Sequence, residues 1–414
     1  MSTPIPRHRR RASSSSRNQS ATLVAAARTL QPRTVALRRA VHRRPEQGLH
    51  LPDTQAAVLA ALADLPVRVR PGHSASSVVG VIDGARPGPT VLLRADMDAL
   101  PVTECSGVPF SSEVPGAMHA CGHDMHVAML ASAARLIAER REEIAGRVLL
   151  MFQPGEEGFH GARHMLDEGL LDVAGMPERA LALHVTSTLD CGLVQSRPGT
   201  LMASSDVLRV AVTGRGGHAS APQNAVDPVP AAAAMVGAMQ TMVTRTLNVF
   251  DPAVVTVTRI VAGTNSNIIP EHAELEGTIR ALSEHARAKV HEEVRRVCEH
   301  VAAAHGCSCV VEIEHGYPVT VNDDEVSLEV IDVARRVLGD RHAEPMADPM
   351  MGSEDFSYVL AKVPGAMAFV GACPPGCEPD TAPANHSNRV VFDESAMVHG
   401  VALYAGFALE TLTP

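Results

Sequence analysis

The sequence lacks several features that would assign it to common classes of protein. It has no tryptophan, and aromatic residues make up only 3% of its 414 residues. Proteins that bind single-stranded nucleic acids stack the bases on aromatic side chains, so this kind of binding surface is poorly supplied here. No apolar run approaches the roughly 20 residues that a transmembrane helix needs. These absences argue against nucleic acid and membrane as partners.

The sequence also lacks an excess of positive charge and an ordered set of cysteines. Its formal net charge is −10, whereas binding to phosphates needs a basic face. The eight cysteines are scattered from Cys105 to Cys377, which is not the pattern of a disulfide framework. A reduced compartment is therefore the simplest expectation, and we predict a cytoplasmic protein.

The first 20 residues differ from the rest of the chain. They contain five arginines, a run of four serines and no acidic residue. This composition predicts a disordered basic tail over residues 1–20, with a targeting segment as the alternative. The remaining length is too great for one ordinary core and predicts two domains or three.

Residues 21–202 alternate between two kinds of apolar pattern. Helical spacing predicts helices over 34–44, 54–65 and 127–144, and short apolar runs predict strands over 77–82, 90–93, 147–152 and 180–183. Asp83-Gly84 after the first run is typical of a hairpin turn. The alternation predicts an α/β catalytic domain with a central sheet flanked by helices. Ligands of such sheets bind at the carboxyl ends of the strands.

Residues 203–314 have a different organisation. Two predicted helices, 229–242 and 285–304, accompany about four predicted strands: 207–213, 254–260, 273–280 and 309–313. This content predicts a compact α+β domain. Because ligand-type residues lie on both sides of it, we interpret it as an insertion into the catalytic domain, which resumes over residues 315–414.

Cys121-Gly122-His123 is the most informative motif. It places a thiol and an imidazole two residues apart, and both are good ligands for a divalent metal. Taken alone, Cys121 could be a small buried residue and His123 a helix cap. Further ligand-type residues, however, stand at the ends of predicted strands or in their loops: Asp96, Asp98, Glu156, Glu157, His184 and His386. This convergence predicts a metal site of a kind suited to zinc, or to manganese or cobalt with less preference.

Glu156-Glu157 suggests the chemistry of that site. Adjacent carboxylates repel each other unless a cation or a proton separates them. A division of labour would resolve the repulsion, with Glu157 binding metal and Glu156 taking a proton from metal-bound water, whose pKa falls to about 7. The alternative is an exposed acidic turn. Together with the ligand set, the pair predicts a hydrolase.

Three residues of the inserted segment are candidates for substrate binding. His218 follows two glycines, Asn267 lies in a loop, and Arg280 ends a predicted strand. His218 and Arg280 have ordinary structural explanations, as part of a turn and as a solvated charge. If this domain closes over the metal, Arg280 and Asn267 could clamp a substrate carboxylate, and His218 could polarise a carbonyl. His126, at helical spacing from His123, is expected to orient a neighbouring carboxylate.

Five segments, taken together and in order, resemble the metal-dependent amidohydrolases of the aminoacylase and carboxypeptidase superfamily. They are RADMDALP at 94–101, MHACGHDMH at 118–126, FQPGEEG at 152–158, GSEDF at 352–356 and NHS at 385–387. The resemblance covers about residues 33–410, and it is greatest to the branch of hippurate hydrolase, auxin-conjugate hydrolases and N-acyl-amino-acid amidohydrolases. Ala262 departs from the pattern, since a second glycine is usual there.

The resemblance implies a centre of two divalent metal ions, zinc or manganese, with cobalt or nickel also suited. Its ligands would be Cys121, His123, Glu157, His184 and His386. It implies that Glu156 is the general base and that Asp98 lies behind the site. It further implies that the inserted domain is a lid, which could also form a homodimer, and that His218, Asn267 and Arg280 contact the substrate.

The activity implied by the resemblance is hydrolysis of the amide bond of N-acylated amino acids. A dipeptidase or carboxypeptidase that uses the same metal centre is one alternative. A non-catalytic relative that binds a metabolite is the other. The intact Glu156 and the complete ligand set argue against the latter.

Overall fold

The computed structural model describes residues 14–413, and the chain divides into two compact units. The first unit comprises the chain up to Arg197, then Asp323–Met346 and the segment from Val363 on. The second comprises Pro198–Asn322 and Ala347–Lys362. The second unit thus extends the predicted insertion, 203–314, at both ends and adds a separate segment.

A mixed eight-stranded sheet forms the centre of the first unit. Its order is β1-β2-β4-β3-β5-β16-β6-β15. Strands β3, β4, β5 and β16 run parallel, while β1 and β2 form an antiparallel edge. The predicted α/β fold with a central sheet is confirmed. The strands span Arg68–Pro71 (β1), Val78–Asp83 (β2), Arg86–Asp96 (β3), Ala145–Gln153 (β4), Arg179–Thr186 (β5), Val194–Ser196 (β6), Ala343–Pro345 (β15) and Gly365–Gly371 (β16).

The predicted hairpin at Asp83-Gly84 is wrong. β4 lies between β2 and β3, pairing antiparallel with the first and parallel with the second. The reason is burial: β4 is buried over Val148–Gln153 and takes a central position, in which β2 and β3 pair with its two edges. Glycine is needed at position 84, where the chain passes from β2 to β3 beside the start of β4, because a Cβ there would lie 2.6 Å from the carbonyl oxygen of Ile144.

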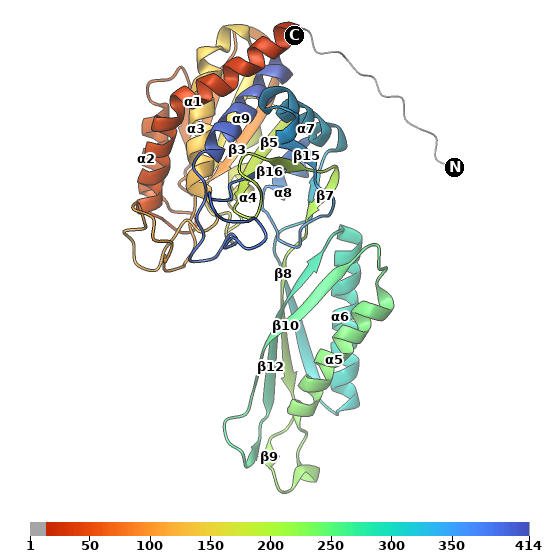
Figure 1. Ribbon diagram of the computed structural model, residues 1–414. Coiled ribbons are helices and arrows are strands. Elements are labelled where there is room, and N and C mark those ends of the chain that lie inside the picture. The colour runs from red at the N-terminus through yellow and green to blue at the C-terminus, as the bar shows by residue number, and fades with distance from the viewer. Residues whose placement is uncertain (1–13, 414) are drawn as a thin grey trace, which may run out of the picture. The chain divides into compact units, whose positions relative to one another are not determined.

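Helices pack against this sheet and against one another. α3, α7 and α9 contact its strands, and α1 packs on these three helices (Figure 1). α3 and α9 are buried along nearly their whole length; α9 is apolar on all sides over most of its length, whereas α3 also buries the polar residues His123, Asp124 and His126. The helices of this unit are α1 Ser14–Arg43, α2 Pro52–Leu62, α3 His123–Glu139, α4 Gly161–Asp167, α7 Asp324–Leu338 and α9 Ala396–Leu412.

The start of α1 bears on the predicted tail. The helix begins at Ser14, so residues 14–20 of that segment are helical, whereas residues 1–13 lie outside the described part of the chain. The helix packs on α3, α7 and α9, and extending a helix that is already formed costs little.

The second unit is an antiparallel sheet with two helices. The sheet order is β10-β12-β8-β13, and α5 and α6 pack on it (Figure 1). Burial alternates along β8, so one face lies in the core. Asp227 and Ser283 cap α5 and α6 with side-chain oxygens. The main elements are β8 Asp206–Thr213, α5 Pro228–Thr246, β10 Ala253–Ala262, β12 His272–Ala281, α6 Glu284–Ala304 and β13 Ser308–His315.

Shorter elements complete the second unit. Two small sheets pair β7 (Gly199–Met202) with β14 (Thr320–Asn322), and β9 (Gly217–His218) with β11 (Ile268–Ile269). α8 spans Ser357–Leu360. Across both units, single 3-10 turns occur at Arg141–Glu143, Leu170–Asp172, Pro222–Asn224 and Asp340–His342.

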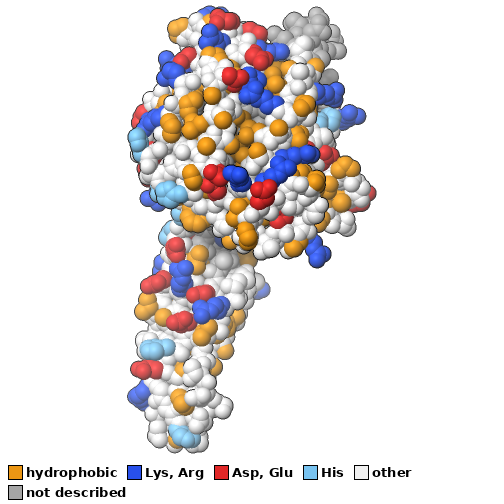
Figure 2. All heavy atoms as spheres, turned by 90° about the vertical axis from the view of Figure 1, so that its left-hand side faces the viewer, with side chains coloured by type: hydrophobic (Ala, Val, Ile, Leu, Met, Phe, Trp, Pro, Cys, Tyr) orange, Lys and Arg blue, Asp and Glu red, His pale blue; other side chains and the backbone are white. Residues whose placement is uncertain are grey.

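The surface carries charges of both signs. On the face drawn in Figure 2, basic and acidic side chains are interspersed. Exposed ion pairs such as Arg33–Asp64 contribute little stability, so the two apolar cores provide most of it. Over residues 14–413, none of the helices combines the length and the apolar character that crossing a membrane requires.

Candidate metal centre

The candidate residues gather at the carboxyl ends of three adjacent parallel strands. β3 ends at Asp96, two residues before Asp98, and β4 ends at the paired Gln153, shortly before the two glutamates. His184 lies two residues before the end of β5, which pairs with β3 on the side opposite β4. This is the edge of the sheet at which the sequence predicted a ligand site.

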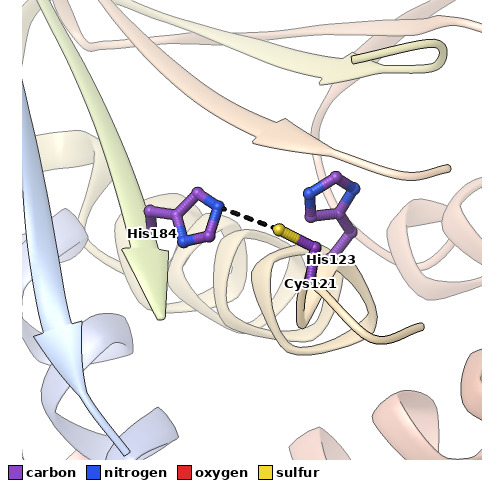
Figure 3. Close-up of side chains that lie close together, drawn as sticks. All are labelled: Cys121, His123 and His184. Carbon is purple, nitrogen blue, oxygen red and sulfur yellow. Dashed lines mark hydrogen bonds between the residues drawn. The ribbon is translucent and has the colours of Figure 1, made fainter. Parts of the chain in front are cut away.

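The turn before α3 brings Cys121 to this edge. Gly122 has a φ of 86° and is the N-cap of the helix, and a Cβ there would lie only 2.4 Å from Cγ2 of Val185. Only glycine fits this left-handed position so close to β5. As a result the Cys121 thiol points at β5, with its Sγ 3.4 Å from Nε2 of His184 (Figure 3).

His386 reaches the same point from a distant loop. Its φ of 71° is left-handed, and its N–H donates to the carbonyl of Ala120. Its Nε2 lies 3.3 Å from Cys121 Sγ and 3.2 Å from Oε1 of Glu157. Asn385 fixes the loop by donating from Nδ2 to the carbonyl of Val185 at 2.9 Å. The sequence predicted no role for Asn385, although the Asn-His-Ser segment that contains it is part of the family resemblance.

Asp98 holds the two glutamates and one histidine in place. Its Oδ1 accepts the backbone N–H of Glu156 at 2.9 Å, and its Oδ2 accepts that of Glu157 at 3.0 Å. Its carbonyl oxygen lies 2.8 Å from Nδ1 of His123. A carbonyl can only accept, so Nδ1 carries a hydrogen, and Nε2 is the ring nitrogen through which His123 could bind a metal.

Two groups of ligand-type atoms share the thiol of Cys121. Cys121, His123 and His184 make one group, and Cys121, Glu157 and His386 make the other; within each, the ligand atoms lie within 4.8 Å of one another. Among the described residues, the buried atom His123 Nε2 has no hydrogen-bond partner. Buried polar atoms without partners are costly, and cations would satisfy them. Thiolate, imidazole and carboxylate together fit zinc and related divalent ions.

The electrostatics show how these groups interact with one another. Hydrogen bonds with Cys121 and Glu157 raise the pKa of His386 to about 10. Burial raises the pKa of the Cys121 thiol, and burial lowers the pKa of His184 well below its usual value. The cluster therefore favours a protonated thiol and a neutral His184. A divalent cation changes this balance, because a coordinating thiol loses its proton.

His126 and Asp96 form a layer behind these groups. Nδ1 of His126 contacts the carboxylate of Asp96, which also pairs with Arg94 at 2.7 Å. Nε2 of His126 accepts the backbone N–H of Val185 at 2.8 Å. His126 thus orients a buried carboxylate and ties α3 to β5, as expected from its spacing. Asp96, His123 and His126 also lie close enough together to form a ligand-type group of their own.

The candidate substrate residues lie in the second unit, at the two ends of its sheet. His218 on β9 pairs with Ile268 on β11, and the carbonyl of Asn267 accepts the N–H of Ala219. Both lie beyond the His272 end of β12, while Arg280 is near the other end. These ends are roughly 27 Å apart at ~3.4 Å per residue. Within one copy, the structure places Asn267 beside His218 and does not bring it to Arg280.

Comparison with known proteins gives matches along most of the chain. A model of the peptidase family M20/M25/M40 matches residues 92–410. Thermostable carboxypeptidase 2 of Saccharolobus solfataricus is 37% identical over 91% of this chain and 94% of its own. IAA-amino acid hydrolase ILR1-like 2 of Arabidopsis thaliana is 35% identical over 91% of this chain and 85% of its own.

Among solved structures, the YXEP protein of Bacillus subtilis superposes with a TM-score of 0.80 at 31% identity. The match covers 94% of this chain and 100% of that one. Its crystal structure is described as that of a dinuclear metal binding peptidase from the M20 family.

Proposed function

Because the chain belongs to peptidase family M20/M25/M40, we propose that this hydrolase cleaves the amide bond of N-acylated amino acids in a metal-dependent reaction. The observation that carries the proposal is the pair of ligand groups that share Cys121, beside the two glutamates held by Asp98. The name of the Arabidopsis relative, an amino-acid conjugate hydrolase, supports this substrate class.

In the proposed centre, five side chains would hold two divalent cations: those of Cys121, His123, Glu157, His184 and His386. Such cations polarise a carbonyl and make a water molecule more acidic near neutral pH. The candidate ions are zinc or manganese, with cobalt or nickel also suited to these ligands.

Glu156 is the proposed general base. Glu156 is only 6% exposed, and its backbone N–H donates to Asp98. Its carboxylate lies beside the ligand-type atoms of His123 and Glu157. It would take a proton from the attacking water and pass it to the leaving amine. Asp98 acts by positioning, because both of its oxygens already accept backbone hydrogens.

The inserted unit would supply the contacts to the rest of the substrate. Arg280 is half-buried, and its guanidinium suits a substrate carboxylate. His218 and Asn267 lie too far along β12 to join it from the same copy. We therefore propose a homodimer through the second unit, in which the other copy provides His218 for the carbonyl oxygen and Asn267 beside it.

A carboxypeptidase or dipeptidase is the second candidate, favoured by the name of the Saccharolobus relative. The two activities would share the centre and differ in the acyl pocket. Rates with N-acetyl, N-benzoyl and aminoacyl derivatives of one amino acid separate them. A marked preference for aminoacyl substrates would favour the peptidase.

The test of the mechanism is Glu156→Gln. The amide keeps the shape but cannot accept a proton, so hydrolysis should fall by about 10²–10⁴-fold while the metal content persists. Glu142→Gln, at a side chain 77% exposed, is the matched control and should leave the rate unchanged. Retained activity would exclude Glu156 as the base. Loss of metal from the variant would make Glu156 a ligand instead.

A further inference from the structure

A cluster of buried charges lies behind the turn that carries Cys121 and His123. Arg38 and His42 come from α1, and Asp124 comes from the first turn of α3. Their exposed fractions are 2%, 3% and 0%. The spacing of residues 34–44 predicted a helix, but it did not predict that Arg38 and His42 would be buried.

Asp124 is the centre of this cluster. Its Oδ2 accepts from Nε of Arg38 at 2.6 Å and from Nδ1 of His42 at 2.8 Å. Nε2 of His42 lies 3.1 Å from Oε1 of Glu104, in the loop that leads to α3. Burial opposes a charge on His42, but Asp124 and Glu104 outweigh it and raise its pKa to about 9. At neutral pH both ring nitrogens therefore donate.

The position of Asp124 couples this cluster to the ligand turn. It directly follows His123, and neighbouring helical side chains point about 100° apart. His123 can thus face the metal centre while Asp124 faces α1. On the opposite side, Gly122 packs against Val185 of β5. The turn that carries Cys121 and His123 therefore lies between β5 on one side and Arg38 and His42 of α1 on the other.

Stability alone does not account for this arrangement. Burying charges costs desolvation energy that their attraction only partly repays, and apolar residues of similar size often stabilise as well or better. What a buried, hydrogen-bonded ion pair does supply is a defined direction for the residue that carries it. Groups that orient metal ligands typically change metal affinity by about 10–100-fold when they are removed.

We propose that Arg38 and His42 are positioning residues for the Cys121–His123 turn and act through Asp124. They touch neither substrate nor metal. They hold the first turn of α3 so that the thiol and the imidazole converge. The inference rests on the proposed function, since it takes Cys121 and His123 as ligands.

A pair of substitutions at His42 separates its two contacts. In His42→Asn the amide nitrogen takes the place of Nδ1 and keeps the bond to Asp124. In His42→Gln it takes the place of Nε2 and keeps the bond to Glu104. We expect His42→Gln to weaken Co²⁺ binding by about tenfold or more, and His42→Asn to bind nearly as tightly as wild type.

Two readouts report on the turn itself. Competition with a chelator gives the dissociation constant for Co²⁺, and the thiolate-to-cobalt charge-transfer absorption shows whether Cys121 is bound. Equal affinities and spectra for the two His42 variants would overturn the proposal. Absence of the thiolate band from wild type would instead refute the proposed metal centre, so the two failures are distinguishable.

A second pair keeps the test decisive if a His42 variant does not fold. Arg38→Gln and Arg39→Gln both remove a contact to Glu394, but only Arg38 also contacts Asp124. We expect the Arg38 variant alone to weaken Co²⁺ binding and the thiolate band. Equal effects of the two substitutions, or no effect of either, would overturn the inference.

Discussion

Substituting Asp98 by asparagine tests how the centre is held together. The carboxylate is 1% exposed and accepts two backbone hydrogens, from Glu156 and Glu157. The asparagine oxygen can accept only one of them, and its NH₂ group faces the other N–H. Hydrogen bonds to charged groups contribute about 1.5–3 kcal/mol, so the free energy of unfolding should fall by about 2–3 kcal/mol.

The same change should lower catalysis. The turn after β4 carries the proposed base Glu156, and a displacement of about 1 Å near reacting groups can cost 10²-fold in rate. We expect kcat/KM for an N-acyl amino acid to fall by about that factor. The loss should lie mainly in kcat, because Asp98 positions the base and does not contact the substrate.

The assay has two parts. Urea unfolding is followed by circular dichroism, since the protein has no tryptophan for fluorescence, and hydrolysis is followed by release of the amino acid. Asp167→Asn makes the same chemical change at a side chain 75% exposed and serves as the control. Because Asp98 bonds to backbone N–H groups, its loss should destabilise chelated and metal-loaded protein alike. Unchanged stability and rate, or a loss confined to the metal-loaded form, would refute this reasoning.

Two further predictions concern the surroundings of the centre. The raised pKa of His42 means that its bonds to Asp124 and Glu104 stabilise the fold fully below pH 6.5 and lose this effect as pH rises through about 9. The difference in unfolding free energy between wild type and His42→Gln should therefore shrink from neutral to alkaline pH, and a difference that grows would contradict it. Gly122→Ala should cost about 2–4 kcal/mol, because a left-handed φ is combined with a Cβ placed 2.4 Å from a side-chain carbon of β5. Gly116 has a similar φ of 76°, but a Cβ there would meet no atom within 4 Å. Gly116→Ala should therefore cost less in the same unfolding assay, and its cost gives the contribution of the left-handed backbone alone. Equal costs for the two substitutions would argue against the steric overlap with Val185.

Local patterns predicted much of the first unit. Apolar runs between turn residues marked the central strands, and helical spacing marked α3 over 127–144, close to the observed His123–Glu139. The motifs predicted the family, which the match over residues 92–410 confirms. These signals are local, since they depend on residue types within a few positions of one another.

Strand order and buried charge were not predictable in this way. Asp83-Gly84 has the composition of a hairpin turn, yet β4 separates the two strands beside it. Arg38 lies in a segment whose spacing predicted only a helix, and the structure shows that it is buried against Asp124. In both cases the partner comes from a segment distant in the sequence: β4 for β2 and β3, and Asp124 for Arg38.

The sequence by itself determined which chemistry is available: a thiol, imidazoles and carboxylates that suit divalent cations, placed after strands of an α/β sheet. Only the tertiary structure decided that His386 comes within 3.3 Å of Cys121 across 265 residues, and that Asp98 holds both glutamates by their backbones. The physical reason is that ligand chemistry belongs to single side chains. The distances between them depend on strand order and loop paths, which arise from burial across the whole unit.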